Sequence, residues 1–151
     1  MKLEGLKTLT IGYHSLLFHT IYVTLSWKKI YEKYPTTKEF ICILLHDIGR
    51  INQDKRKEDT HPELGARICG YLFGDKYYEL CIGHSRDYAS KYKIKLSKLC
   101  YADKYCGILT PIWLLCILSE FDKPTVLIIR EKYVKWWNEN GNNINYGGLL
   151  K

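Results

Sequence analysis

The sequence predicts an all-α protein that folds as one compact helical bundle of about six or seven helices. Three observations predict it. Apolar residues recur at helical spacing along most of the chain, capping signals and Gly or Pro residues separate the apolar segments, and 151 residues is the length of one domain. We expect the domain to span residues 1–140 and residues 141–151, rich in Asn and Gly, to form a flexible tail.

The first predicted helix runs from about Lys7 to Lys33. Its apolar stripe consists of Ile11, Leu17 or Phe18, Ile21 and Leu25. His14 lies on the same stripe, so we expect it to face the interior. His19 lies about 140° further around the helix, at about 100° per residue, and is therefore expected at the surface.

The next two helices carry explicit start and stop signals. Thr36 and Glu39 form the pattern of a capping box, and the helix that they start is expected to end near His46, with Gly49 as the breaker. The polar stretch 52–60 reads as a loop. The dipeptide His61-Pro62 opens the following helix, since Pro is well tolerated in a first turn, and Gly74 closes it.

The second half of the chain continues the pattern. Asp75 can cap a helix that carries His84, and Ser97 begins a segment that places Asp103 on an apolar face. The other inward positions of that segment are Leu99, Cys100 and Cys106. A lone carboxylate on such a face is disfavoured unless a partner compensates its charge. The last two helices begin at Thr110-Pro111 and Lys123-Pro124, the latter reaching about Asn138.

The pair His46-Asp47, at the end of an apolar segment, is the most informative feature of the chain. Burying an ionised carboxylate beside an imidazole is costly without compensation. A divalent cation is the simplest compensation, because imidazole nitrogen and carboxylate oxygen are both metal ligands. Two consecutive residues cannot complete a coordination sphere, so further ligands must come from elsewhere in the chain.

Further His and Asp residues occur in recognisable settings. They are His14 in Tyr-His-Ser, His61 in HPELGA, His84 in Gly-His-Ser, and Asp103 in Ala-Asp-Lys. With the His-Asp pair, this ordered set resembles the HD-domain superfamily of metal-dependent phosphohydrolases, from residue 10 to about residue 120.

The resemblance implies a metal site. The family's four core ligands fall on His14, His46, Asp47 and Asp103, and the additional histidines of its two-metal members fall on His61 and His84. The alternatives are that His61 only caps its helix and that His84 is a hydrogen-bonded core or surface residue. We therefore expect one or two divalent ions, whether Mn, Fe, Zn, Ni, Co or Mg.

The resemblance also implies roles for cations near these ligands. Arg50 follows Asp47 by three residues, Arg86 follows His84 by two, and Lys104 is adjacent to Asp103. Each could bind a phosphate oxygen or could be an ordinary surface charge. We assign catalytic roles to Asp47, Arg50 and Lys104, and substrate binding to Arg50, Ser85, Arg86 and Lys104.

The function that the resemblance implies is hydrolysis of a phosphate ester by a metal-activated water. The enzyme would be a phosphomonoesterase, phosphodiesterase or nucleotidase, and its substrate a nucleotide or another small phosphorylated metabolite. Two alternatives remain open. The same six residues resemble HD-fold di-iron oxygenases, and a non-catalytic nucleotide-binding protein would use the basic charge alone. A nucleic-acid partner is not expected, because no nucleic-acid-binding motif is present, and a homo-oligomer remains open.

Charge, cysteine content and hydropathy give expectations about the substrate, the state of the thiols and the location of the protein. The formal net charge is +7, and basic residues concentrate at 50–57 and 86–98, which suits phosphorylated substrates as well as a lysine-rich surface. The six cysteines form no C-x-x-C pair and lie in apolar contexts, which favours reduced core residues over disulfides or a zinc site. The longest apolar stretch, 111–118, is far below the roughly 20 residues that a bilayer requires. We expect a cytoplasmic protein without a membrane partner.

Overall fold

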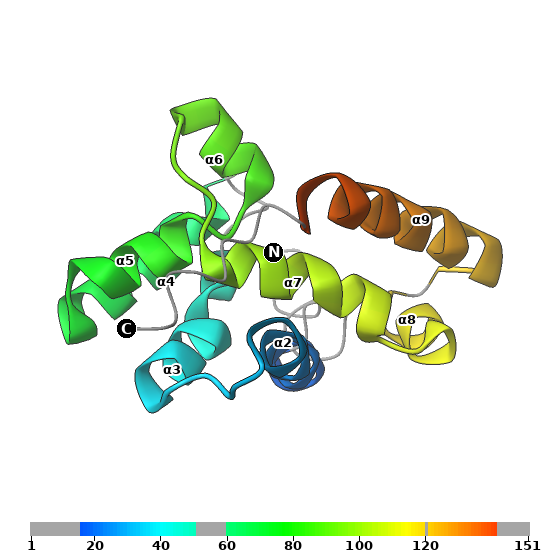
Figure 1. The fold of residues 1–151 in the computed structure, drawn as a ribbon, viewed down its shortest axis with the longest axis horizontal. Coiled ribbons are helices and arrows are strands. Elements are labelled where there is room, and N and C mark those ends of the chain that lie inside the picture. The colour runs from blue at the N-terminus through cyan, green and yellow to red at the C-terminus, as the bar shows by residue number, and fades with distance from the viewer. Residues whose placement is uncertain (1–15, 51–59, 120, 142–151) are drawn as a thin grey trace, which may run out of the picture.

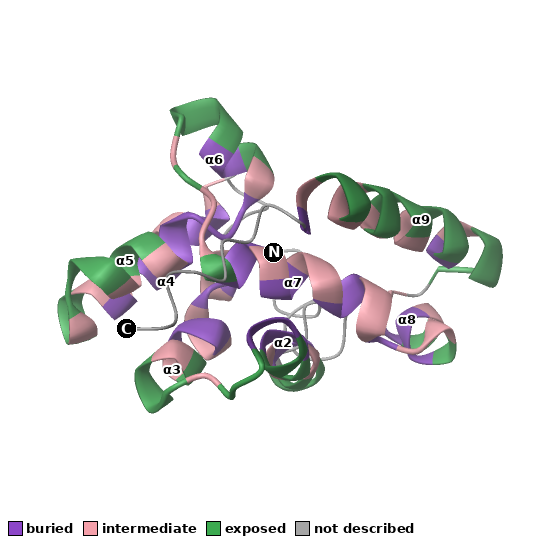
Figure 2. Cartoon of the chain, viewed as in Figure 1, coloured by how far each residue is buried: buried purple, intermediate pink, exposed green. Residues whose placement is uncertain are grey.

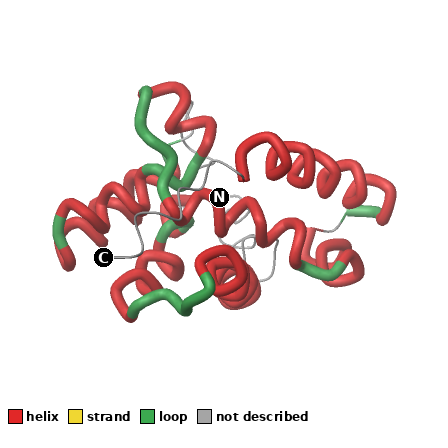
Figure 3. Tube along the Cα trace, in the orientation of Figure 1, coloured by secondary structure: helices red, strands yellow, loops and turns green. Residues whose placement is uncertain are grey.

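The computed structural model describes residues 16–50, 60–119 and 121–141. Within these residues the chain forms α-helices and no strand, which confirms the all-α prediction (Figures 1 and 3). The helices are α2 (Leu16–Tyr31), α3 (Thr37–Leu45), α4 (His61–Phe73), α5 (Asp75–Ile82), α6 (Arg86–Tyr92), α7 (Lys98–Leu109), α8 (Ile112–Ser119) and α9 (Lys123–Asn140).

Helix α7 is central to the described part of the chain and contacts α2, α5 and α9 (Figure 1). Helices α4 and α5 pack side by side, and α3 contacts both of them and α2. Figure 2 shows exposed residues on the outer faces of α5, α6 and α9 and buried residues where the helices meet. Helix α3 therefore lies between α2 on one side and the pair α4 and α5 on the other.

Two apolar clusters form the core, one on each side of α3. The first joins α2, α3 and α7 through Val23, Trp27, Ile30, Tyr31, Ile43, Leu99, Ala102 and Cys106. The second joins the four helices α3, α4, α5 and α6 through Cys42, Ala66, Cys69, Cys81, Ile82 and Tyr88. Consecutive residues of α3, Cys42 and Ile43, thus belong to different clusters. This anchors the segment that leads directly into the His-Asp pair.

The predicted capping signals mark most helix boundaries correctly. The Thr36 hydroxyl accepts a hydrogen bond from the Glu39 amide, and the Glu39 carboxylate accepts one from the Thr36 amide at 2.8 Å, which completes the capping box. Pro62 lies in the first turn of α4, and Ser97 caps α7. At the start of α5 the expectation was wrong by one position, since Gly74 is the cap and Asp75 the first helical residue.

The predicted orientation of the first helix was wrong. Leu17, Phe18, Ile21 and Leu25, expected inside, are exposed. The buried face instead carries His19, Val23 and Trp27, of which the last two are fully buried. Helix α2 has apolar residues on both faces, so periodicity alone did not distinguish them. Truncating a buried aromatic residue costs about 3–5 kcal/mol, so the burial of Trp27 is a strong reason for this orientation.

Helix α6 was not among the predicted helices, and it accounts for the eighth α-helix in the described residues. This helix has only seven residues and carries no apolar stripe. Ser85 caps it by accepting a hydrogen bond from the Tyr88 amide. Two other predictions, His14 as an inward-facing residue and the flexible tail beyond Gly141, lie outside the described residues.

Among the described helices, none by itself has the length and apolar character needed to cross a bilayer. Helices α7 and α8 meet this criterion only when taken together, and they are bent by 105° relative to each other. The six cysteines are all free, and five of them are buried, in agreement with their expected place in the core.

Candidate metal centre

Five segments of the core bring histidine and aspartate side chains together. His19 comes from α2 and Asp103 from α7, while His46 and Asp47 occupy the turn after α3. His61 is the first residue of α4, and His84 lies in the turn after α5. All six are buried, with 1–8 % of each residue exposed. Polar side chains this deeply buried require compensation by one another or by a ligand.

The first group of ligand atoms lies between α2, α3 and α7. The Nε2 atom of His19 is 3.0 Å from Asp103 Oδ1 and 3.3 Å from His46 Nε2. Asp47 Oδ2 lies 3.7 Å from His19 Nε2 and 3.6 Å from His46 Nε2. On its other edge, the His19 ring places Nδ1 at 3.6 Å from the Cys106 sulfur, which leaves Nε2 directed into the group.

The second group lies on the other side of Asp47. Its Oδ1 atom is 3.4 Å from His61 Nε2 and 3.5 Å from His84 Nε2, and these two nitrogens are 3.1 Å apart. The two oxygens of Asp47 therefore face different sets of nitrogen atoms. One carboxylate is shared between two clusters of potential ligands.

Backbone carbonyls fix the orientation of two of the histidines. His46 Nδ1 is 2.6 Å from the Ile43 carbonyl oxygen, and His84 Nδ1 is 2.6 Å from the Cys81 carbonyl oxygen. A carbonyl oxygen can only accept, so each Nδ1 must donate a proton. In the neutral ring this leaves the lone pair on Nε2, which is the atom that enters the cluster.

The electrostatic setting keeps His46 and Asp103 in the forms that bind cations. Burial lowers the pKa of His46 to about 3, so its ring is neutral near pH 7. Burial alone would raise the pKa of Asp103, but Lys104 and His19 outweigh it and hold that pKa well below its ordinary value. Metal binding requires neutral imidazoles and ionised carboxylates, and His46 and Asp103 meet this requirement. Although burial acts to lower it, Cys106 and Asp103 raise the pKa of His19 well above its ordinary value, so a metal ion bound there would displace the His19 proton.

Lone pairs and carboxylate oxygens thus converge in a buried space. Neutral imidazole nitrogens and carboxylate oxygens suit divalent first-row metals, and the donor atoms of His19, His46 and Asp47 lie within 4.8 Å of one another, as do those of Asp47, His61 and His84. These buried groups could hold a metal ion, with Asp47 common to both sets.

Two glycines allow the close backbone packing that creates this spacing. A Cβ atom on Gly65 of α4 would overlap the Leu45 carbonyl oxygen at the end of α3. A Cβ atom on Gly49 would overlap the carbonyl oxygen of His61. Any larger residue at either position would separate the start of α4 from the turn that carries His46 and Asp47. The glycines of the two sequence motifs therefore keep His61 close to His46 and Asp47.

The structure brings together five of the six predicted ligands, His46, Asp47, His61, His84 and Asp103. The sixth, His14, lies outside the described residues. His19 is the residue that sequence reasoning missed. It was expected at the surface, but only 6 % of it is exposed. Its spacing from Val23 and Trp27, at four and eight residues, was the signal that could have identified it.

The predicted cations are close to the ligands, but two of them contact the carboxylates directly. Arg50 Nε is 3.0 Å from Asp47 Oδ1, and Lys104 Nζ is 2.5 Å from Asp103 Oδ2. Although burial acts to lower it, the Asp103 carboxylate raises the pKa of Lys104 above its ordinary value. Both cations offset the negative charge of the carboxylates.

The other two predicted substrate-binding residues have structural contacts of their own. Ser85 is buried and its hydroxyl caps α6. The Arg86 guanidinium lies 5.5 Å from the centre of the Trp136 ring of α9, within the range of a cation–π contact. Their binding of substrate remains a prediction.

The chain matches no protein-family model, and neither the curated proteins nor the solved structures contain a match. Its class must therefore be argued from the geometry of the site.

Proposed function

We propose that this chain is a metal-dependent phosphohydrolase of the HD-domain type, acting on a nucleotide or another small phosphorylated metabolite. The observation that carries the proposal is the placement of Asp47, whose two oxygens face two separate sets of imidazole nitrogens. A carboxylate placed in this way can bridge two divalent ions, as two-metal hydrolases require. His19 takes the position that the sequence pattern had assigned to His14.

Divalent ions held by these residues would polarise a phosphoryl oxygen and lower the pKa of a water molecule toward neutrality. The chain contributes the orientation of the ligands. The carbonyls of Ile43 and Cys81 set the tautomers of His46 and His84, and Lys104 keeps Asp103 ionised beside His19. No side-chain nucleophile is needed in this scheme.

Arg50 is the best-placed residue for contact with substrate. Its side chain is 28 % exposed, while its Nε atom contacts the buried Asp47 carboxylate. The guanidinium therefore spans from the ligand cluster, where its Nη2 atom lies 3.5 Å from His61 Nε2, to solvent, and a guanidinium can bind a phosphate oxygen. Because that contact strengthens as charge develops on the transferred group, it should act on kcat more than on KM.

The test is an anaerobic screen of nucleotides and sugar phosphates with protein loaded with Mn²⁺, Fe²⁺ or Zn²⁺, with released phosphate as the readout. We expect release from at least one substrate, and a loss of at least about tenfold in kcat for Arg50→Ala with its metal content retained. Arg50→Lys should recover part of this loss, because the charge remains while the bidentate geometry is lost. Arg67→Ala is the matched control, since Arg67 is 74 % exposed and pairs only with Glu63 among the contacts described.

Two outcomes would contradict the proposal. Iron-loaded protein that consumes O₂ and releases no phosphate from any compound would indicate a di-iron oxygenase. Protein that binds nucleotides tightly and turns none of them over with any of the three metals would indicate a binding protein.

A further inference from the structure

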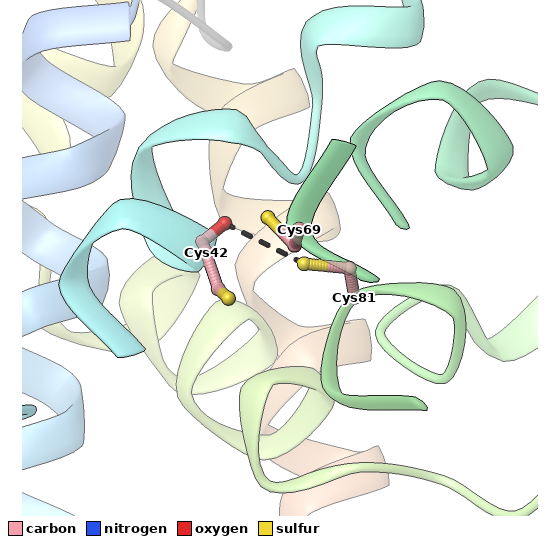
Figure 4. A group of neighbouring side chains, drawn as sticks. All are labelled: Cys42, Cys69 and Cys81. Atoms are coloured by element: carbon pink, nitrogen blue, oxygen red, sulfur yellow. Dashed lines mark hydrogen bonds between the residues drawn. The ribbon is translucent and has the colours of Figure 1, made fainter. Parts of the chain in front are cut away.

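A second cluster of chemically reactive side chains, separate from the His and Asp residues, lies in the core. Cys42 of α3, Cys69 of α4 and Cys81 of α5 are neighbours, and the Cys81 thiol donates a hydrogen bond to the Cys42 carbonyl oxygen at 3.9 Å (Figure 4). Their sulfur atoms all lie within 4.8 Å of one another, and each residue is fully buried. All three thiols are free. Three helices therefore contribute one sulfur each to a single point in the core.

The spacing of the sulfurs suits one shared central atom. Three sulfurs bonded to one atom at about 2.3 Å would lie about 4 Å apart in a trigonal plane, and somewhat closer in a pyramid. The observed sulfurs, all within 4.8 Å of one another, are close to this spacing. A disulfide would need two of the sulfurs to approach to about 2.05 Å, and it would leave the third thiol unused.

The residues around the three sulfurs determine which charge a bound atom should carry. The buried neighbours in the same cluster are Ala66, Ile82 and Tyr88, and the partly buried ones are Leu45, Tyr77, Leu80 and Ile94. Among charged groups, the Glu39 carboxylate acts on the Cys42 thiol, and its negative charge adds to that of a thiolate instead of offsetting it. Three thiolates around a monovalent or divalent cation would leave net negative charge in this apolar core, which is costly. A trivalent centre would leave none.

We propose that Cys42, Cys69 and Cys81 form a binding site for a trivalent thiophilic centre, with arsenite as the representative ligand. In the binding step As(OH)₃ loses its three As–O bonds and gains three As–S bonds. The three thiol protons leave with the three hydroxides as three molecules of water. No electron is transferred, so no oxidant or reductant is required, and the product is neutral.

The site goes beyond the proposed hydrolase function and does not depend on it, but the backbone links the two. The Cys42 carbonyl accepts a hydrogen bond from the His46 amide at 2.9 Å, and the Cys81 carbonyl is the partner of His84 Nδ1. The backbone of two cysteines in the thiol cluster thus contacts one histidine of each ligand set.

The experiment uses the full reduced chain, incubated with arsenite and examined by native mass spectrometry. We expect one arsenic per chain, with a mass increase of one arsenic atom less three hydrogens. Alkylation rates of the wild type with and without arsenite, followed long enough for the buried thiols of the arsenite-free chain to react, then map the site without any substitution. Protection that depends on arsenite should be confined to Cys42, Cys69 and Cys81. Each of the single changes C42A, C69A and C81A should weaken binding at least about 100-fold, whereas C100A and C116A should leave it unchanged.

Protection of Cys100 or Cys106 to the same extent as the three thiols would overturn the proposal. So would binding that is equally tight to the urea-unfolded chain, since the folded core would then contribute nothing. A preference for Zn²⁺ over arsenite at the same thiols would overturn the argument from charge. Circular dichroism shows whether each variant folds. If a variant does not fold, the alkylation map of the wild type tests the proposal without it.

Discussion

Replacing Asp47 with asparagine is expected to remove metal binding from both ligand sets and to reduce phosphate release by at least about 10³-fold. One oxygen of Asp47 lies near His19 and His46, and the other lies near His61 and His84. Asparagine keeps the shape but removes the charge that two cations share. Loss of a single electrostatic contact typically costs about 10²- to 10³-fold in kcat, and this change affects both sites at once.

The same substitution should also remove the effect of metal ions on the melting temperature. A ligand at 100 times its Kd stabilises the folded state by about 2.7 kcal/mol per site, so the metal-loaded wild type should melt at a higher temperature than its chelated form. Asp47→Asn should show no such difference between metal and chelator. Asp87→Asn, an exposed carboxylate on α6, is the control and should behave as the wild type does. A variant at Asp47 that still gains stability from metal and turns over normally would refute the metal site.

The second large effect is expected for His19→Ala. Its Nε2 atom contacts both His46 and Asp103, so its loss removes one of four ligand atoms from the first set. Even an outer partner of a metal ligand is worth 10- to 100-fold in affinity, and a direct ligand should be worth more. We expect metal affinity to fall by more than about 100-fold, as measured by competition with a chelator of known affinity.

His14→Ala is the informative comparison for this prediction. The sequence pattern favours His14 as the ligand, whereas the buried position of His19 favours His19. If His14→Ala loses metal and His19→Ala does not, the site must be assembled differently from the arrangement described. The melting temperature of each metal-free variant shows whether either change acts through folding alone.

The parts of this fold that could be predicted are those with local causes. The capping box at Thr36, the Pro in the first turn of α4 and the cap at Ser97 each depend on residues within one turn. The His-Asp pair and Asp103 were also recognisable, because a charged group on an apolar stripe is costly without a partner. These signals do not require knowledge of the tertiary structure.

The rest depended on tertiary contacts. The rotation of α2 follows from the packing of Trp27 and Tyr31 against α3 and α7, which sequence periodicity cannot weigh when both faces of a helix are apolar. The thiol cluster draws on α3, α4 and α5, with no short spacing between its cysteines. Only the folded chain brings these sulfurs together.

The most direct test of the central claim, that Asp47 is shared by two metal sites, is a count of Mn²⁺ bound per chain. Mn²⁺ prefers oxygen and nitrogen ligands to thiols, so the cysteine cluster should not contribute to the count. With free Mn²⁺ quantified by electron paramagnetic resonance, we expect two ions in the wild type and one in His84→Ala. A wild type that binds a single ion, or a His84→Ala variant that still binds two, would contradict the shared site.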